Sequence, residues 1–181
     1  MLAYTTYSEA GGVGKTTSAA NFGVAHARAG LKTLLIPLDQ QEGNLSRLLN
    51  VDHNRTAEVD TLAHHMVESP QGDFEDLIET TEHGVDVIPE HNNLGELPQW
   101  LQTKKKQSEQ VGNEFNTKSA LLNVLLRNNV RDKYDVVICD PPATEGTHLH
   151  NAINATRSLV LPIEPSSKGS ASVEGDRKSV V

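Results

Sequence analysis

The sequence predicts an α/β protein, a three-layer sandwich in which a mostly parallel, twisted sheet of about five strands has helices on both faces. Strand-length apolar segments alternate with helical patterns along the chain. The apolar residues of two predicted strands are consecutive, as in strands covered on both faces. A chain of 181 residues is long enough for one substantial core and short for two. We therefore expect residues 1–181 to form a single domain.

Five segments have the length and composition of β-strands. In chain order they are residues 2–7, 33–38, 85–89, 134–140 and 158–163. The stretches LLI and VVIC, in the second and fourth segments, are apolar at every position instead of every second one. A strand with one face in water alternates, whereas a strand between two layers of helices does not. This pattern favours a parallel sheet.

Three helical patterns lie between these strands. They cover residues 16–29, which Gly30 ends; residues 57–68, with Thr56 as the N-cap; and residues 118–129. The last pattern places four leucines on one side of a helix: Leu121, Leu122, Leu125 and Leu126. Residues 101–116 are polar and have little periodicity, so we expect an exposed connection there.

Charge and composition exclude several classes of protein. The net charge of −8 disfavours passive attraction to nucleic acid or to an anionic membrane. The single Cys139 lies in an apolar run, which indicates a core residue and no disulfide framework. The N-terminus lacks signal-peptide features, and no apolar run approaches the roughly 18 residues of a membrane span. We expect a cytoplasmic protein without membrane attachment.

The segment SEAGGVGKTTSAAN has the pattern of a phosphate-binding loop. Its glycines follow a predicted strand, and its Lys-Thr-Thr begins a predicted helix. Glycines let consecutive backbone N–H groups converge on one anion, and the helix N-terminus adds to that field. An ordinary glycine-rich turn is the alternative, but the flanking strand and helix favour a site for a nucleoside triphosphate. The predicted cofactor-binding residues are Gly11, Gly12, Val13, Gly14, Lys15, Thr16 and Thr17.

Within this loop, three side chains have separate predicted roles. Lys15 reaches the β- and γ-phosphates, the Thr16 hydroxyl binds Mg²⁺, and Thr17 contacts the α-phosphate. The cofactors expected from the loop are therefore ATP and Mg²⁺.

The loop resembles the deviant phosphate loop of the ParA/MinD family of ATPases, whose motif runs Lys-Gly-Gly-x-Gly-Lys-Thr-Thr. Ala10 stands in place of the first lysine. The segment PLDQQEGNLS resembles the family segment that follows the second strand, YDVVICDPPATEG resembles the Walker B strand with its loop, and SLVLPIEPS resembles the strand after it. The resemblance thus covers nearly the whole chain. Family members continue past the last of these segments with further strands and helices, so we expect this chain to lack the C-terminal part of the fold.

The resemblance assigns roles to two aspartates. Asp140 ends an apolar strand and is expected to orient a water on Mg²⁺, with Thr16 as the second metal-site residue. The alternative for Asp140 is a cap on the turn before two prolines. Asp39 is expected to position the attacking water, and the alternative is an aspartate in a surface loop. Asp39 and Lys15 are the predicted catalytic residues.

Ala10 bears on the mechanism. In the family, the lysine at this position reaches across a dimer interface to the partner's nucleotide, and a methyl group cannot do so. Losing a cation from a phosphoryl transition state costs on the order of several kcal/mol when nothing replaces it. We expect nucleotide binding to survive and hydrolysis to be slow or to depend on another cation.

The resemblance implies an ATP-dependent switch in plasmid or chromosome partitioning. Such a switch forms a nucleotide-dependent homodimer and works with a ParB-like partner. Lys104, Lys105 and Lys106 form a basic cluster, and the two interpretations of it are contact with non-specific DNA and simple exposure to solvent. The alternatives are a non-catalytic nucleotide-binding module and an ATP-dependent amide ligase. His64, His65, His148 and His150 do not have ligand spacing, so no metal besides Mg²⁺ is expected.

Overall fold

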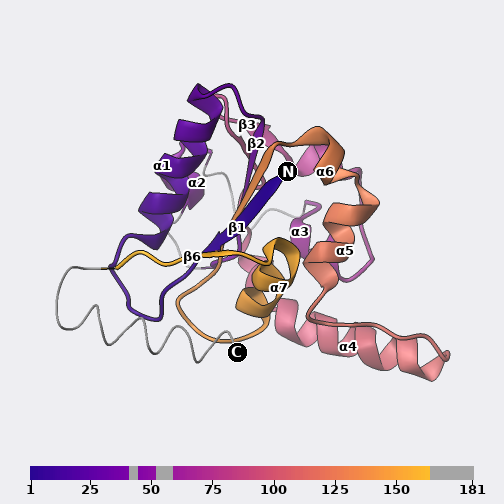
Figure 1. The fold of residues 1–181 in the computed structure, drawn as a ribbon. Helices are drawn as coiled ribbons and strands as arrows, with labels where there is room; N and C mark the ends of the chain where they lie inside the picture. Colours follow the sequence, from indigo (N-terminus) through magenta and orange to yellow (C-terminus); the bar gives the residue numbers. More distant parts are fainter. Residues whose placement is uncertain (41–44, 52–58, 164–181) are drawn as a thin grey trace.

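The computed structural model describes residues 1–40, 45–51 and 59–163 (Figure 1). Strands and helices alternate along most of this part of the chain. The elements are β1 (Leu2–Thr6), α1 (Lys15–Arg28), β2 (Thr33–Pro37), α2 (Leu45–Leu48), α3 (Leu62–Met66), η1 (Phe74–Leu77), β3 (Glu79–Thr80), β4 (Asp86–Val87), η2 (Asn92–Gly95), α4 (Leu97–Gln110), α5 (Ala120–Arg127), α6 (Val130–Lys133), β5 (Val136–Asp140), α7 (Thr147–Thr156) and β6 (Leu159–Val160).

One six-stranded sheet organises the molecule, in the order β3-β4-β2-β5-β1-β6. All neighbouring strands are parallel except β3 and β4, which are antiparallel. The predicted fold class is confirmed, and the five predicted strand positions each contain a strand. The sixth strand, β3, was not predicted. It pairs with β4 across a turn in which Gly84, at φ 74°, occupies the left-handed region that glycine adopts without strain.

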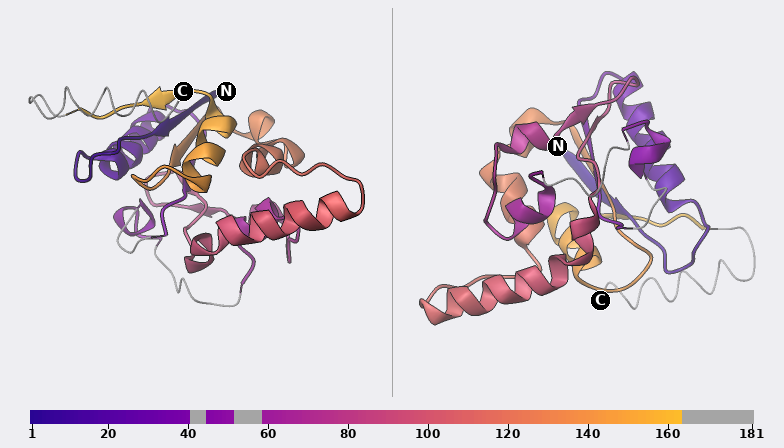
Figure 2. Two further views of the ribbon diagram at one scale, coloured as in Figure 1. Left: turned by 90° about the horizontal axis from the view of Figure 1, so that it is seen from below. Right: turned by 180° about the vertical axis from the view of Figure 1, so that it is seen from behind.

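Two hydrophobic cores lie on opposite faces of the sheet. One contains residues of α3, α4, α5 and α7, and the other contains residues of α1 and α2. Along β2, Leu34 and Ile36 belong to the first core and Leu35 to the second. The side chains of β5 divide in the same way. Figures 1 and 2 show the sheet between α1 on one side and α5 and α7 on the other. The consecutive apolar residues are thus explained by two covered faces.

The prediction of an exposed connection over residues 101–116 is wrong. Most of this segment belongs to α4, a helix of 14 residues that projects from the body of the molecule (Figure 2). Only Leu97 and Leu101 of α4 are buried. Because only the first half of the helix buries apolar side chains, the second half has no reason to carry an apolar stripe, and its sequence shows none.

The predicted helices differ from the observed ones in detail. The pattern over residues 57–68 corresponds to α3, which is shorter, and its predicted N-cap Thr56 lies outside the described residues. In α5, Leu121 and Leu125 are buried as expected, whereas Leu126 is 60% exposed. The buried face of α5 is completed by Ala120 and Val124. The helix therefore packs on a narrower stripe than the four leucines suggest.

Candidate functional site

The loop between β1 and α1 has the backbone that its glycines predict. Gly12 and Gly14 have φ values of 78° and 87°, which residues with a side chain rarely adopt. Gly14 is the N-cap of α1, so the N-terminus of a 14-residue helix directs its N–H groups at the loop. The Lys15 ammonium group donates a hydrogen bond of 3.1 Å to the Ala10 carbonyl. The loop thus has two sources of positive potential close together.

An open cleft of about 390 Å³ lies beside this loop. Three parts of the chain line it: the phosphate loop, the end of β2 and the loop that follows β5. They meet because β1, β2 and β5 are parallel neighbours, so their carboxyl ends lie at one edge of the sheet. The lining residues are Gly11, Gly12, Lys15, Thr16, Leu38, Asp39, Gln40, Pro142, Ala143, Thr144 and His148.

Asp140 lies beneath the cleft, at the end of β5. Its side chain is almost fully buried, and one carboxylate oxygen accepts a hydrogen bond of 2.8 Å from the Thr6 hydroxyl. Burial raises the pKa of Asp140 to about 6, and the charge of Asp39 acts in the same direction. Hydrogen bonds from Thr6 and Thr16 and the charge of Lys15 oppose this rise. The contact between Asp140 and Thr16 brings together the two predicted metal-site residues.

The structure places the remaining predicted residues around the cleft. Lys15 and Asp39, predicted as catalytic, both line it, as do Gly11 and Gly12. Three other loop residues do not line the cleft: Val13, Gly14 and Thr17. Of these, Gly14 serves as the helix N-cap and Thr17 is exposed in the first turn of α1. These positions leave the predicted roles of the side chains as predictions.

His148 lines the cleft and was considered in the sequence only as a metal ligand. It lies in the first turn of α7, and its Nε2 is 2.8 Å from the Leu94 carbonyl of η2. Burial lowers the pKa of His148, while the contact with Leu94 and the charge of Asp39 oppose that effect. Its nearness to Asp39 depends on the packing of α7 against η2. No local sequence signal indicates that contact.

A second group of histidines surrounds Asp60. Although His64 and His65 are adjacent in α3, both contact this carboxylate: His64 Nδ1 lies 3.2 Å and His65 Nε2 2.8 Å from its oxygens. The Gly72 backbone N–H also donates to it, at 2.9 Å. In the described ranges, no three His, Cys, Asp or Glu side chains form a group suited to a metal ion. Asp60 therefore anchors α3.

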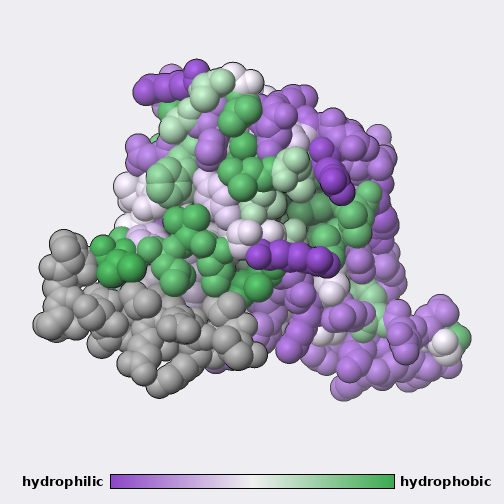
Figure 3. Space-filling view, viewed as in Figure 1, coloured by the Kyte–Doolittle hydropathy of each residue, from purple (hydrophilic) through white to green (hydrophobic). Residues whose placement is uncertain are grey.

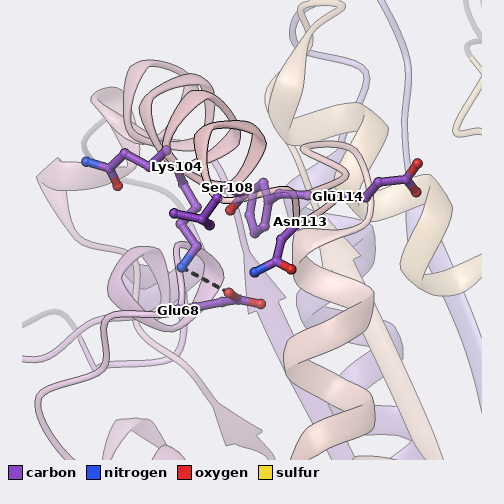
Figure 4. A pocket seen from close by; sticks show the side chains of 8 residues that line it. Glu68, Lys104, Ser108, Asn113 and Glu114 are labelled. Atoms are coloured by element: carbon purple, nitrogen blue, oxygen red, sulfur yellow. Dashed lines mark ion pairs between the residues drawn. The ribbon is translucent and has the colours of Figure 1, made fainter.

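Another cavity, of about 460 Å³, lies between α4 and the segment that follows it. Figure 4 shows Lys104 and Asn113 reaching toward Glu68, whereas Glu114 points away. Lys104 Nζ lies 3.0 Å from a Glu68 oxygen, and Arg127 pairs with the other oxygen at 3.2 Å. Glu68 thus connects three helices at the molecular surface. The cavity is separate from the phosphate loop and shares no lining residue with the first cleft.

The outer surface is mixed in character. Figure 3 shows hydrophobic residues gathered along β6, the edge strand of the sheet. Leu159 and Val160 of this strand are partly exposed, and Ile163 beyond it is about half exposed. Among the helices that the structure describes, none is long and apolar enough to cross a membrane.

Comparison with known proteins places the sequence in a family. Residues 4–175 match the family AAA_31, described as an AAA domain. A chromosome-partitioning ATPase, Soj, from Treponema pallidum is 32% identical over 157 residues, which are 87% of this chain and 54% of Soj. The chain spans about half the length of the curated relatives it matches.

Solved structures share the fold at lower identity. Cobyrinic acid a,c-diamide synthase from Mycobacterium smegmatis, with a bound ATP analogue and magnesium, superposes with a TM-score of 0.82 at 20% identity, over 99% of this chain and 67% of the synthase. A complex of McdA with ATP from Cyanothece gives 0.76 at 20% identity, over 99% and 62%. The family match over almost the whole chain, the phosphate loop and this shared fold lead to one conclusion: the chain belongs to the ParA/MinD-type P-loop ATPases.

Proposed function

We propose that the chain binds Mg·ATP in the cleft beside the phosphate loop and hydrolyses it slowly. One observation carries the proposal: the cleft brings Lys15 and Thr16 of the loop together with Asp39 from the end of β2. Nucleotides are present in solved structures of the same fold, where the synthase holds an ATP analogue with magnesium and McdA holds ATP. The residues of this chain fit the same ligand.

The loop suits a triphosphate. Gly12 and Gly14 have the positive φ values that let backbone N–H groups converge on one anion, and the N-terminus of α1 adds its partial positive charge. Lys15 already lies over the loop, with its ammonium group on the Ala10 carbonyl. A phosphate oxygen is a stronger acceptor for an ammonium group than a carbonyl oxygen. We infer that Lys15 exchanges this carbonyl for the β- and γ-phosphates.

The oxygen ligands available beside the loop suit Mg²⁺. Thr16 offers a hydroxyl and Asp140 a carboxylate, and the two are hydrogen-bonded to each other. Hard cations prefer such oxygen ligands, and Mg²⁺ usually keeps several waters. We infer that Thr16 binds the ion directly and Asp140 through a water. The bound ion neutralises charge on the β- and γ-phosphate oxygens.

Asp39 is the proposed acceptor for the attacking water. It lines the cleft and is partly buried, at the carboxyl end of a strand that neighbours β5. A carboxylate there can accept a hydrogen bond from a water molecule and hold that water near the terminal phosphate. Ala10 supplies no cation to the transferring group, which is why we propose slow hydrolysis.

Partitioning is the proposed biological role. The Treponema relative is named a chromosome-partitioning ATPase, and this supports a role in partitioning. From the family resemblance we further propose an ATP-dependent switch that acts on DNA cargo in the cytoplasm as a nucleotide-dependent homodimer with a ParB-like partner. The ion pairs of the α4 lysines disfavour direct DNA contact through this helix. Lys104 pairs with Glu68 and Lys105 with Glu109, which leaves their charges partly neutralised.

A non-catalytic nucleotide-binding module is the second candidate, and Ala10 favours it. The two candidates share the binding site and differ in turnover. Phosphate release from Mg·ATP by the purified chain separates them, because a switch turns over and a sensor does not.

The Asp39→Ala variant is expected to lower phosphate release about tenfold or more, while its affinity for ATP stays close to that of the native chain. Asp73→Ala, at an exposed position remote from the cleft residues in sequence, is the matched control.

Ala10→Lys is expected to raise turnover about tenfold or more because it returns a cation to the site. If the native chain and Ala10→Lys both bind ATP and release no phosphate, the sensor is correct.

A further inference from the structure

His148 connects the nucleotide cleft to η2. The ring lines the cleft, and its Nε2 contacts the Leu94 carbonyl at 2.8 Å. The next residue of η2, Gly95, lies against the Gln40 side chain so closely that a Cβ there would clash with the Gln40 amide oxygen. Gln40 also lines the cleft. Two residues of the cleft lining, His148 and Gln40, thus contact η2.

The contact with Leu94 determines which ring nitrogen of His148 carries a proton. A backbone carbonyl only accepts hydrogen bonds, so Nε2 must be the donor. Burial lowers the pKa of the ring, which favours the neutral form. In a neutral imidazole with hydrogen on Nε2, Nδ1 is an acceptor. Among the described residues, no hydrogen bond to Nδ1 is present.

As a hydrogen-bond acceptor in this cleft, Nδ1 of His148 binds some ligands and not others. Phosphate oxygens at neutral pH are also acceptors, so they do not bind Nδ1 of this tautomer. Water is the natural partner, since it donates two hydrogens. Asp39, on the same cleft, offers a second acceptor. A water that donates one hydrogen to each residue keeps its lone pairs free for attack.

We propose that His148 is a positioning residue, which together with Asp39 orients the attacking water in the phosphate cleft. This proposal rests on the proposed ATPase function and adds a residue to its site. Attack forms a bond from the water oxygen to the terminal phosphorus and breaks the bond to the bridging oxygen, which leaves on ADP with the electron pair. The proton that the water loses ends on the released phosphate.

Two substitutions distinguish a role of His148 in positioning the water from a purely structural role. Glutamine can place an amide N–H near the position of Nε2 and keep the bond to Leu94, but it offers no acceptor at the position of Nδ1. His148→Gln is therefore expected to fold and to bind Mg·ATP within about threefold of the native affinity, with phosphate release about tenfold lower. His150→Gln, two residues further along α7 and outside the cleft lining, is the control. Equal turnover in both variants and the native chain overturns the proposal.

A spectroscopic readout tests His148 without relying on turnover. Nitrogen-15 NMR of the imidazole is expected to show hydrogen on Nε2 and none on Nδ1, and the Nδ1 signal is expected to shift when a non-hydrolysable Mg·ATP analogue is added. Hydrogen on Nδ1, or an Nδ1 signal that the analogue leaves unchanged, overturns the proposal. Calorimetry on the same sample distinguishes the two failures. An analogue that binds without moving Nδ1 contradicts the role of His148 alone, whereas an analogue that gives no heat contradicts the proposed function.

Discussion

Asp140 shows at the level of one residue how a site can cost stability. The carboxyl group is buried and its pKa is raised from 3.8 to about 6, chiefly by burial. The folded chain therefore holds this proton over a pH range in which the unfolded chain has released it. The contribution of Asp140 to the free energy of unfolding falls as the pH rises between these two values and stays low above them. A bound cation would offset this cost.

The Asp140→Asn variant is expected to be more stable than the native chain at about pH 7.5, without nucleotide and with a chelator present. The gain is on the order of 2 kcal/mol, because an amide carries no charge to bury and its oxygen still accepts from Thr6. The gain should vanish near pH 4, where the native carboxyl is protonated. Urea unfolding at both pH values measures it, and Asp73→Asn is the exposed control. A variant less stable than the native chain at both values contradicts the argument.

The residues around the cleft differ in how far the sequence alone predicts their positions. The phosphate loop is predictable because all its parts are adjacent in the chain and its glycines have a backbone role. The positions of Asp39 and Asp140 are predictable because Asp39 follows one parallel strand and Asp140 ends its neighbour. His148 was not, since its importance depends on the Leu94 carbonyl, 54 residues away. Asp60 was missed for a related reason: a carboxylate before a short helix has no motif of its own.

At the level of elements, α5 tests how a helix is held on the sheet. Leu125 and Leu126 are neighbours of the same residue type, yet Leu125 is 6% exposed and Leu126 60% exposed. Leu125→Ala is expected to lower the free energy of unfolding by about 2 to 4 kcal/mol, because it leaves a cavity in the core. Leu126→Ala is expected to change it by less than about 0.5 kcal/mol. Chemical denaturation of both variants checks the difference, and equal losses would refute the packing of α5.

Asp60 provides the matching test for α3. Burial raises the pKa of this carboxyl, but hydrogen bonds from His65 and from the backbone N–H groups of Gln71 and Gly72 outweigh it, and the net pKa is lowered. Its stabilising effect is therefore present above the usual carboxyl pKa and is lost as the pH falls through the lowered value.

Asp60→Asn is expected to reduce the free energy of unfolding by about 1 kcal/mol near pH 7, because an amide forms weaker hydrogen bonds than a carboxylate. Below about pH 3 the loss should shrink, since the native carboxyl is then protonated. Thermal unfolding at both pH values measures the change. A loss that is the same at both values would show that the charge of Asp60 plays no part.

Elements differ in how far their sequences predict them. The segments that form β2 and β5 can be predicted because both of their faces are covered, which makes several consecutive residues apolar. In contrast, Leu97 and Leu101 are the only buried residues of α4, so periodicity does not reveal the helix. The short β3 is set by its pairing with β4, and that pairing is a tertiary contact. Local sequence patterns thus predict strands whose two faces are both covered, and they miss a helix that buries residues only near one end.

For the whole molecule, the sheet topology explains why the site lies where it does. The neighbouring strands β2, β5 and β1 are parallel, so Asp39, Asp140 and the phosphate loop all follow carboxyl ends at one edge. The two cores hold these strands from opposite faces. The sequence predicts this arrangement well because alternation of strands and helices leads to few topologies. It does not predict the position of α4 relative to the body.

The central claim is that the loop from Gly11 to Thr17, with the ammonium group of Lys15, binds the phosphates of ATP. Isothermal titration calorimetry with Mg·ATP tests it most directly, on the native chain, on Lys15→Ala and on the control Lys32→Ala, whose lysine lies just before β2. We expect the native chain and the control to bind alike, and Lys15→Ala to bind about 10- to 100-fold more weakly, as the loss of charged hydrogen bonds implies. No heat from the native chain at millimolar Mg·ATP, or equal binding by Lys15→Ala, would contradict the account.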